Sequence, residues 1–210
     1  ASGTLERDNL RAAFLLELGR IEEARAVLDQ IDIQYNPTAE TFRLRALLSF
    51  VTGNVEQARL AAQRALALEP EGEAVRLVAA CIDYFSSIAA CSCPAVLPAV
   101  PEPVDWVFVK RDDTSLARLR AAATTFGDLA ELARDQAAQH RLLVWRMAAL
   151  ANDYDSQDDS IALCDELLRR EPGDGAVISW IIARGYAIDL SSTAALLRRR
   201  VREGKASIQE

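Results

Sequence analysis

The chain has 210 residues, half of them hydrophobic, and a formal net charge of −7 at neutral pH. It can bury a sizeable core, but its acidic balance argues against a general nucleic-acid binder, which needs a basic face. No apolar run reaches the roughly 18 residues of a membrane-spanning helix, and the start lacks the basic and apolar regions of a signal peptide. We therefore expect a cytoplasmic protein with neither nucleic-acid nor membrane partners.

Alanine is abundant and aromatic residues make up only 6% of the chain. Alanine has the highest helix propensity and lets helices approach closely, so this composition predicts an all-α fold. The four cysteines have no regular spacing, which favours reduced thiols over a disulfide framework. Cys91 and Cys93 together offer two metal ligands where a site needs about four, and His140 has no nucleophile motif around it. We therefore expect no metal, no cofactor and no enzymatic activity.

Two amphipathic helices are predicted between residues 41 and 70, joined by a tight turn at Thr52-Gly53-Asn54. Apolar residues recur every three or four positions after this turn, and before it they are too many for a single stripe. Glycine takes positive φ at a helix C-terminus without a Cβ clash, so Gly53 suits the turn. Pro70 cannot continue the hydrogen-bond ladder and is expected to end the second helix.

The same turn occurs earlier in the chain, where residues 19–25 (GRIEEAR) precede residues 53–59 (GNVEQAR) by 34 positions. This period is that of tetratricopeptide repeats, and the chain resembles that family. In the family's frame, residues 39–72 have small residues and proline at the expected positions: Ala46, Gly53, Ala58, Ala65 and Pro70. Residues 5–38 match in part, with Asp8 at a position where a large residue is usual, a departure expected of a terminal repeat.

A third unit is predicted to begin at Glu73, but the helical pattern fails after it. The prolines between residues 86 and 104 disfavour helix, and an apolar run follows at residues 106–109. We therefore divide the chain into repeats at 1–87, an irregular proline-rich and apolar insertion at 88–111, and further helical repeats at 112–210. An apolar insertion of this length should lie against something.

Helical signals resume at Asp112, where acidic and hydroxyl residues suit a helix N-terminus. The sequence predicts a helix over 116–124, a break at Phe126-Gly127-Asp128 and a further helix from residue 129. Residues 129–152 form either one long helix or two with a break near His140. The frame returns over residues 141–174, and a last pair of helices is expected at 176–187 and 190–202.

Two charged runs have structural explanations. Residues 153–159 are rich in aspartate, but they lack the glycine and closing glutamate of a calcium loop. We interpret them as a turn between helices followed by acidic residues at a helix N-terminus, which the helix dipole favours. Residues 198–202 are rich in arginine, and the acidic net charge favours a solvated helix end over a binding patch.

The resemblance implies that the first helix of each pair lines a concave groove. Carried over position by position, it assigns the candidate partner-binding residues Asn9, Arg43, Leu44, Leu47, Phe50, Val51, Leu77, Val78, Cys81, Tyr84 and Phe85. The family's clamp for a C-terminal carboxylate needs Lys, Asn and Arg side chains. Only Asn9 fits that pattern, so this clamp is rejected.

The predicted function is protein–protein interaction, in which a curved and largely apolar groove binds a partner's peptide or helix. Alternatively, residues 88–108 of the chain itself fold back and fill the apolar groove, and we favour at least partial filling of this kind. The alternative function is a sensor or regulatory repeat segment of a larger signalling or ATPase protein. A repeat domain that contributes to an enzyme's substrate site is a further alternative. Self-association stays open, because exposed terminal faces of a solenoid can pair.

Overall fold

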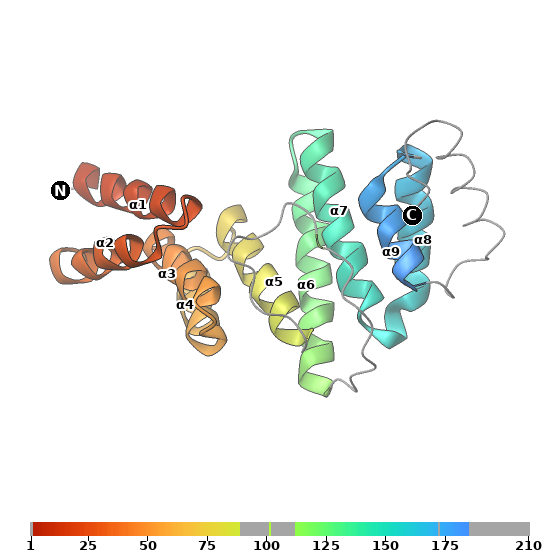
Figure 1. Cartoon of the computed structure of the whole chain (residues 1–210), viewed down its shortest axis with the longest axis horizontal. Coiled ribbons are helices and arrows are strands. Elements are labelled where there is room, and N and C mark those ends of the chain that lie inside the picture. Colours follow the sequence, from red (N-terminus) through yellow and green to blue (C-terminus); the bar gives the residue numbers. More distant parts are fainter. Residues whose placement is uncertain (1, 89–100, 102–111, 172, 185–210) are drawn as a thin grey trace. The chain divides into compact units, whose positions relative to one another are not determined.

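The computed structural model describes residues 2–88, 101, 112–171 and 173–184, and their regular elements are all helices (Figure 1). This confirms the predicted all-α class. The chain divides into two compact units, residues 1–98 and residues 99–210. Among the described helices, none combines the length and the hydrophobicity needed to cross a bilayer.

The first unit contains five helices whose bounds repeat along the chain. They are α1 (Ser2–Glu17), α2 (Ile21–Gln34), α3 (Ala39–Val51), α4 (Val55–Leu68) and α5 (Glu73–Ser87). Helix α4 begins and ends one repeat period after α2, and α5 begins one repeat period after α3. The predicted helices on either side of Gly53, and the predicted start at Glu73, are confirmed.

Two glycine turns close the α1–α2 and α3–α4 hairpins in the same way. Gly19 and Gly53 have φ values of 69° and 79°, the left-handed region that favours glycine. The amide after each glycine donates to the carbonyl five residues back, and the glycine amide donates to the carbonyl three residues back. This is the Schellman pattern, which satisfies the last carbonyl groups of a helix. The period of the sequence is therefore also present in the hydrogen bonds of the backbone.

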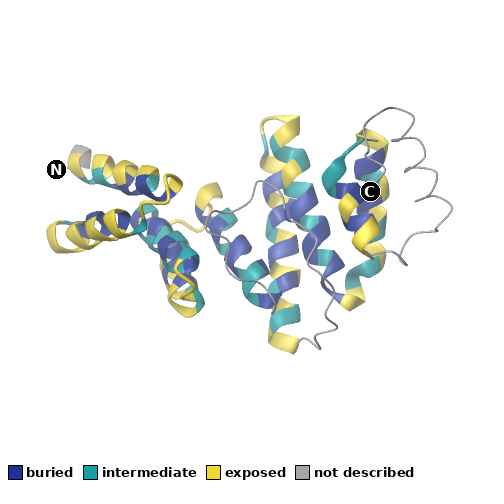
Figure 2. Cartoon of the chain, in the orientation of Figure 1, coloured by how far each residue is buried: buried dark blue, intermediate teal, exposed yellow. Residues whose placement is uncertain are grey.

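Successive hairpins of the first unit share their cores. Helix α3 contacts α1 and α2 on one side and α4 and α5 on the other. Leu44 and Leu48 belong to the cluster built by α1 and α2, whereas Ala46 and Phe50 belong to a cluster with residues of α4 and α5. The buried residues therefore line the contacts between helices (Figure 2). Small residues such as Ala58 let the helices approach closely, because they have no long side chain to accommodate.

The second unit contains four α-helices and a 3-10 turn in its described part. They are α6 (Asp113–Leu132), α7 (Gln136–Ala151), η1 (Tyr154–Ser156), α8 (Gln157–Arg170) and α9 (Gly175–Arg184). Helix α7 packs against α6, α8 and α9. The predicted turn before α8 is confirmed, and Asp158 and Asp159 lie in the first turn of that helix.

The predicted break at Phe126-Gly127-Asp128 is wrong, because α6 continues through it. Gly127 is buried, and a Cβ atom at this position would lie 3.1 Å from the Arg146 guanidinium on α7. The glycine thus lies inside a helix beside the Arg146 side chain and does not mark a turn. Both alternatives for residues 129–152, one long helix or a break near His140, are wrong. One helix ends at Leu132 and the next begins at Gln136, where Asp135 caps α7 by accepting from the Ala138 amide (2.7 Å).

Several expectations lie outside the described residues. They are the path of the insertion at 88–111 apart from Ile88 and Pro101, the Cys91–Cys93 pair, the helix expected at 190–202 and the arginine run at 198–202. Pro101 is buried, and its carbonyl accepts a 2.9 Å hydrogen bond from Trp180 Nε1 on α9. At this point of its length the insertion therefore packs within the second unit.

Candidate partner-binding face

Six of the predicted binding residues form two parallel stripes, which we call the α3–α5 face. On α3 they are Arg43, Leu47 and Val51, and on α5 they are Leu77, Cys81 and Phe85. Residues four apart share one side of a helix, and the two stripes occupy the same register of consecutive repeats. Helices α3 and α5 are in contact, and Leu47 of one stripe and Phe85 of the other pack against the same core cluster.

Most of the α3–α5 face is half-buried and apolar. Leu47 packs partly against the core clusters on both sides of α3, and Phe85 packs against the cluster around Phe50. The Phe50 and Phe85 rings lie 5.5 Å apart between centroids, and Tyr84 meets Phe85 edge to face at 5.2 Å. Aromatic pairs at these distances add to the stabilisation from burial. Phe85 is therefore held in place while part of its surface stays accessible.

Other predicted binding residues lie in the core. Leu44, Phe50, Val78 and Tyr84 are each at most 4% exposed. Their positions in the repeat place them at contacts between helices, where a ligand could reach them only by displacing a neighbour. Cys81 is also buried, and burial raises the pKa of its thiol to about 12. Its place in the α3–α5 face is therefore a packing position between more accessible residues.

Arg43 supplies a charge at one end of the α3–α5 face. Its guanidinium forms two hydrogen bonds with the Glu40 carboxylate, at 2.7 Å from Nε and 2.6 Å from Nη2. Paired bonds of this kind fix the orientation of a guanidinium. The Arg43 side chain keeps only 17% of its surface exposed, so its apolar stem extends the stripe that Leu47 and Val51 continue.

Asn9 has a structural role in the described packing. Its side-chain oxygen accepts from Thr41 Oγ1 at 3.1 Å, and its amide donates to Thr38 Oγ1 at 3.5 Å. Thr38 and Thr41 form the capping box at the start of α3. The buried Asn9 side chain therefore ties α1 to the N-terminus of α3, with both of its polar ends bonded.

A shallow hollow on the second unit contains the chain's single histidine. Its lining residues are Gln136, Ala137, Gln139, His140, Arg141, Arg170 and Glu171. His140 Nε2 bonds to the Asp174 carboxylate, which also accepts from the Ala176 amide at the start of α9 (2.8 Å). The described residues that line this hollow include no serine, threonine or cysteine. The pair joins α7 to α9.

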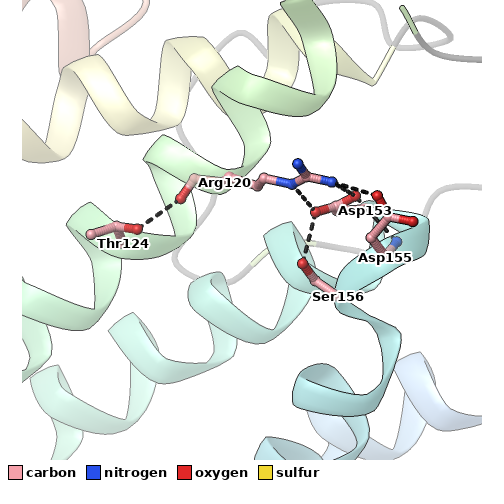
Figure 3. A network of polar contacts seen from close by, with 5 residues as sticks. All are labelled: Arg120, Thr124, Asp153, Asp155 and Ser156. Carbon is pink, nitrogen blue, oxygen red and sulfur yellow. Dashed lines mark hydrogen bonds and ion pairs between the residues drawn. The ribbon is translucent and has the colours of Figure 1, made fainter. Parts of the chain in front are cut away.

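The buried Asp153 carboxylate, whose side chain is 1% exposed, forms an ion pair with the half-exposed Arg120. Figure 3 shows the polar contacts around this pair. Arg120 on α6 donates to Asp153 at 2.6 and 3.1 Å and to Asp155 at 2.8 Å, and Ser156 Oγ donates to Asp153 at 2.7 Å. Burial raises the pKa of the Asp153 carboxyl, but the hydrogen bonds and charge of Arg120 outweigh this and hold the pKa below its ordinary value. The cluster secures the α7–α8 turn, which has no glycine. No described group of His, Cys, Asp and Glu could hold a metal ion.

Comparison of the chain with protein-family models, curated proteins and solved structures finds no match. The resemblance to tetratricopeptide repeats therefore rests on the residues and periodicity of the chain itself.

Sequence reasoning missed the polar contacts between helices. The Asn9–Thr41 bond, the Arg120–Asp153 pair and the His140–Asp174 pair each join residues more than 30 positions apart. The Thr38-Ala39-Glu40-Thr41 segment was the one local signal, because a hydroxyl residue before an apolar helix is typical of an N-cap. Nothing local pointed to the partner of Arg120.

Proposed function

We propose that this chain is a tetratricopeptide-like interaction module whose α3–α5 face binds an amphipathic helix or an extended peptide of a partner protein. The single observation that carries the proposal is the pair of half-buried apolar stripes at equivalent positions of consecutive repeats. Arrays of this kind leave successive first helices side by side and use them as an extended binding surface. The partly exposed Leu47, Val51, Leu77 and Phe85 would supply the apolar contact area.

The chemistry of the α3–α5 face favours a partner segment with apolar anchors. Its accessible side chains are aliphatic or aromatic, and Arg43 and Glu40 provide a charged pair at one end. An amphipathic helix presents such anchors at intervals of three or four residues, and an extended peptide presents them at alternate positions. A few fully buried anchors usually supply most of the binding free energy of such a complex.

Selection from a displayed random-peptide library against the intact chain tests this proposal. Selected peptides should lose at least about tenfold in affinity for Leu47→Glu and Leu77→Glu variants, since a charge at a desolvated contact costs more than about 1.4 kcal/mol. The matched control is Leu60→Glu, because Leu60 is an exposed leucine on α4, a helix that contributes no residue to this face. Peptides that bind all three variants equally would contradict the assignment, provided that circular dichroism shows unchanged folding.

A further inference from the structure

The outer side of α1 carries apolar residues that the first unit leaves uncovered. Leu10 and Phe14 lie within α1 and Leu18 directly follows it, at intervals of four residues that place them on one side. Their exposed fractions are 71%, 61% and 54%. Single exposed apolar residues are ordinary, whereas a contiguous apolar patch marks an interaction surface.

On α3 and α5, the equivalent side packs against the helical hairpin that precedes each helix. The counterparts of Leu10 and Phe14, one and two repeat periods later, are all buried: Leu44, Val78, Leu48 and Ile82. Leu44 and Leu48 pack into the cluster of the α1–α2 hairpin. The two residues of α5 pack into a cluster with alanines of α4. The exposed side of α1 is therefore the same surface that α3 and α5 use to bind a helical hairpin.

A charged residue beside this surface follows the same register. Arg45 on α3 reaches back to α2, where its guanidinium donates to the Leu28 carbonyl at 3.0 Å and to Asp29 at 3.3 Å and pairs with Asp32. The residue one repeat period before Arg45 is Arg11, which is exposed on α1. Arg11 thus stands where an arginine of this chain already binds acidic residues of a preceding second helix.

We propose that Leu10, Phe14 and Arg11 form a docking surface for a helical hairpin of a partner protein. The hairpin's second helix would place aliphatic residues on Leu10 and Phe14, as Leu28 of α2 does for α3. It would also place carboxylates against Arg11, at the counterparts of Asp29 and Asp32. A second copy of the chain is a poor occupant, because its α1–α2 and α3–α4 hairpins are covered by its own α3 and α5. This end surface is separate from the α3–α5 face.

A tandem chain with an in-register copy of the hairpin provides the probe. Residues 1–38 are followed directly by residues 5–210, so that one full repeat is duplicated and the loop before α3 is retained at the junction. Two proteins are compared. One is the tandem chain with Phe14→Cys in its second copy, and the other is the original chain with Phe14→Cys. Peptide-resolved mass spectrometry then follows labelling by a thiol reagent. Docking of the first copy should slow labelling of this cysteine at least about tenfold, as expected for a site that reacts only on local opening.

Matched variants separate docking from a general change in folding. Ile33→Cys serves as the control, because Ile33 is 85% exposed on α2 and should be labelled at one rate in both chains. Arg11→Glu in the second copy should speed labelling at Phe14→Cys about fivefold, and Asp29→Arg with Asp32→Arg in the first copy should slow it again. Equal labelling of Phe14→Cys in the two chains would overturn the proposal. So would concentration-dependent dimerisation of the original chain that Phe14→Glu abolishes, since it would assign the surface to a second copy.

Discussion

Replacing Ala58 by leucine adds three carbon atoms at a position with no exposed surface. Ala58 lies on α4 in the cluster that joins α3, α4 and α5. Its neighbours Ala61 and Ala62 are small because the helices approach closely there. The larger side chain would force the helices apart, and overpacking of this kind typically costs about 1–3 kcal/mol. We expect the free energy of unfolding to fall by that amount.

Urea unfolding followed by circular dichroism measures this effect. With a slope of about 1–3 kcal/mol per molar urea, a loss of about 2 kcal/mol lowers the midpoint by about 1 M. Ala24→Leu should behave in the same way, because Ala24 is the residue one repeat period earlier and is also fully buried. The control is Ala67→Leu: Ala67 is exposed on α4, and its counterpart one period earlier is the exposed Ile33. Equal destabilisation by Ala67→Leu and Ala58→Leu would refute the register.

Three further predictions concern the turns, the buried acid and the thiols. Gly53→Ala should lose about 1 kcal/mol of stability in thermal unfolding, because the φ of 79° at this position strains any residue with a Cβ, although no atom lies within 4 Å of that Cβ. Gly127→Ala, in the middle of α6, is the control. It should not show this loss, since only the movable Arg146 side chain lies near the added Cβ. The lowered pKa of Asp153 stabilises the folded state above about pH 4, and this contribution is lost as the pH falls further. Urea unfolding at pH 6 and pH 3 should therefore show a smaller acid-induced loss in Asp153→Asn than in the unaltered chain. Cys81 and Cys164 are buried and burial raises the pKa of each thiol to about 12, so both should stay unlabelled by a thiol reagent at pH 7.5 until the chain unfolds; labelling at the rate of a free thiol would contradict this.

The helix bounds of the first unit were predictable because local chemistry determines them. Gly19 and Gly53 suit the left-handed turn, and Pro70 follows the end of α4. In the second unit the expectation that a glycine marks a helix end was wrong, since Gly127 lies inside α6. A glycine inside a helix beside a neighbouring side chain looks the same in sequence as one that ends a helix. The residue that lies beside Gly127 is Arg146, which is on another helix, so the local sequence does not distinguish the two cases.

The candidate site was predictable at the level of a helix face. The period identified which residues share a position in the repeat, and the accessible residues Arg43, Leu47 and Leu77 were among those named. It did not separate residues at the surface from those between helices, so Leu44 and Phe50 were included although both are buried. Adjacent positions of a helix differ by about 100° in direction, and the direction of each neighbouring helix decides which of them a ligand can touch.

The two kinds of hairpin turn imply an order of assembly during folding. The turns at Gly19 and Gly53 close with hydrogen bonds that span no more than five residues, so each turn can form as soon as its own segment has been synthesised. The α7–α8 turn instead uses Arg120, which lies 33 residues before Asp153. Contacts between distant residues form only after the entropy of closing a long loop has been lost. The turns at Gly19 and Gly53 thus depend on local contacts alone, whereas the α7–α8 turn gains its bonds to Arg120 only once α6 has docked.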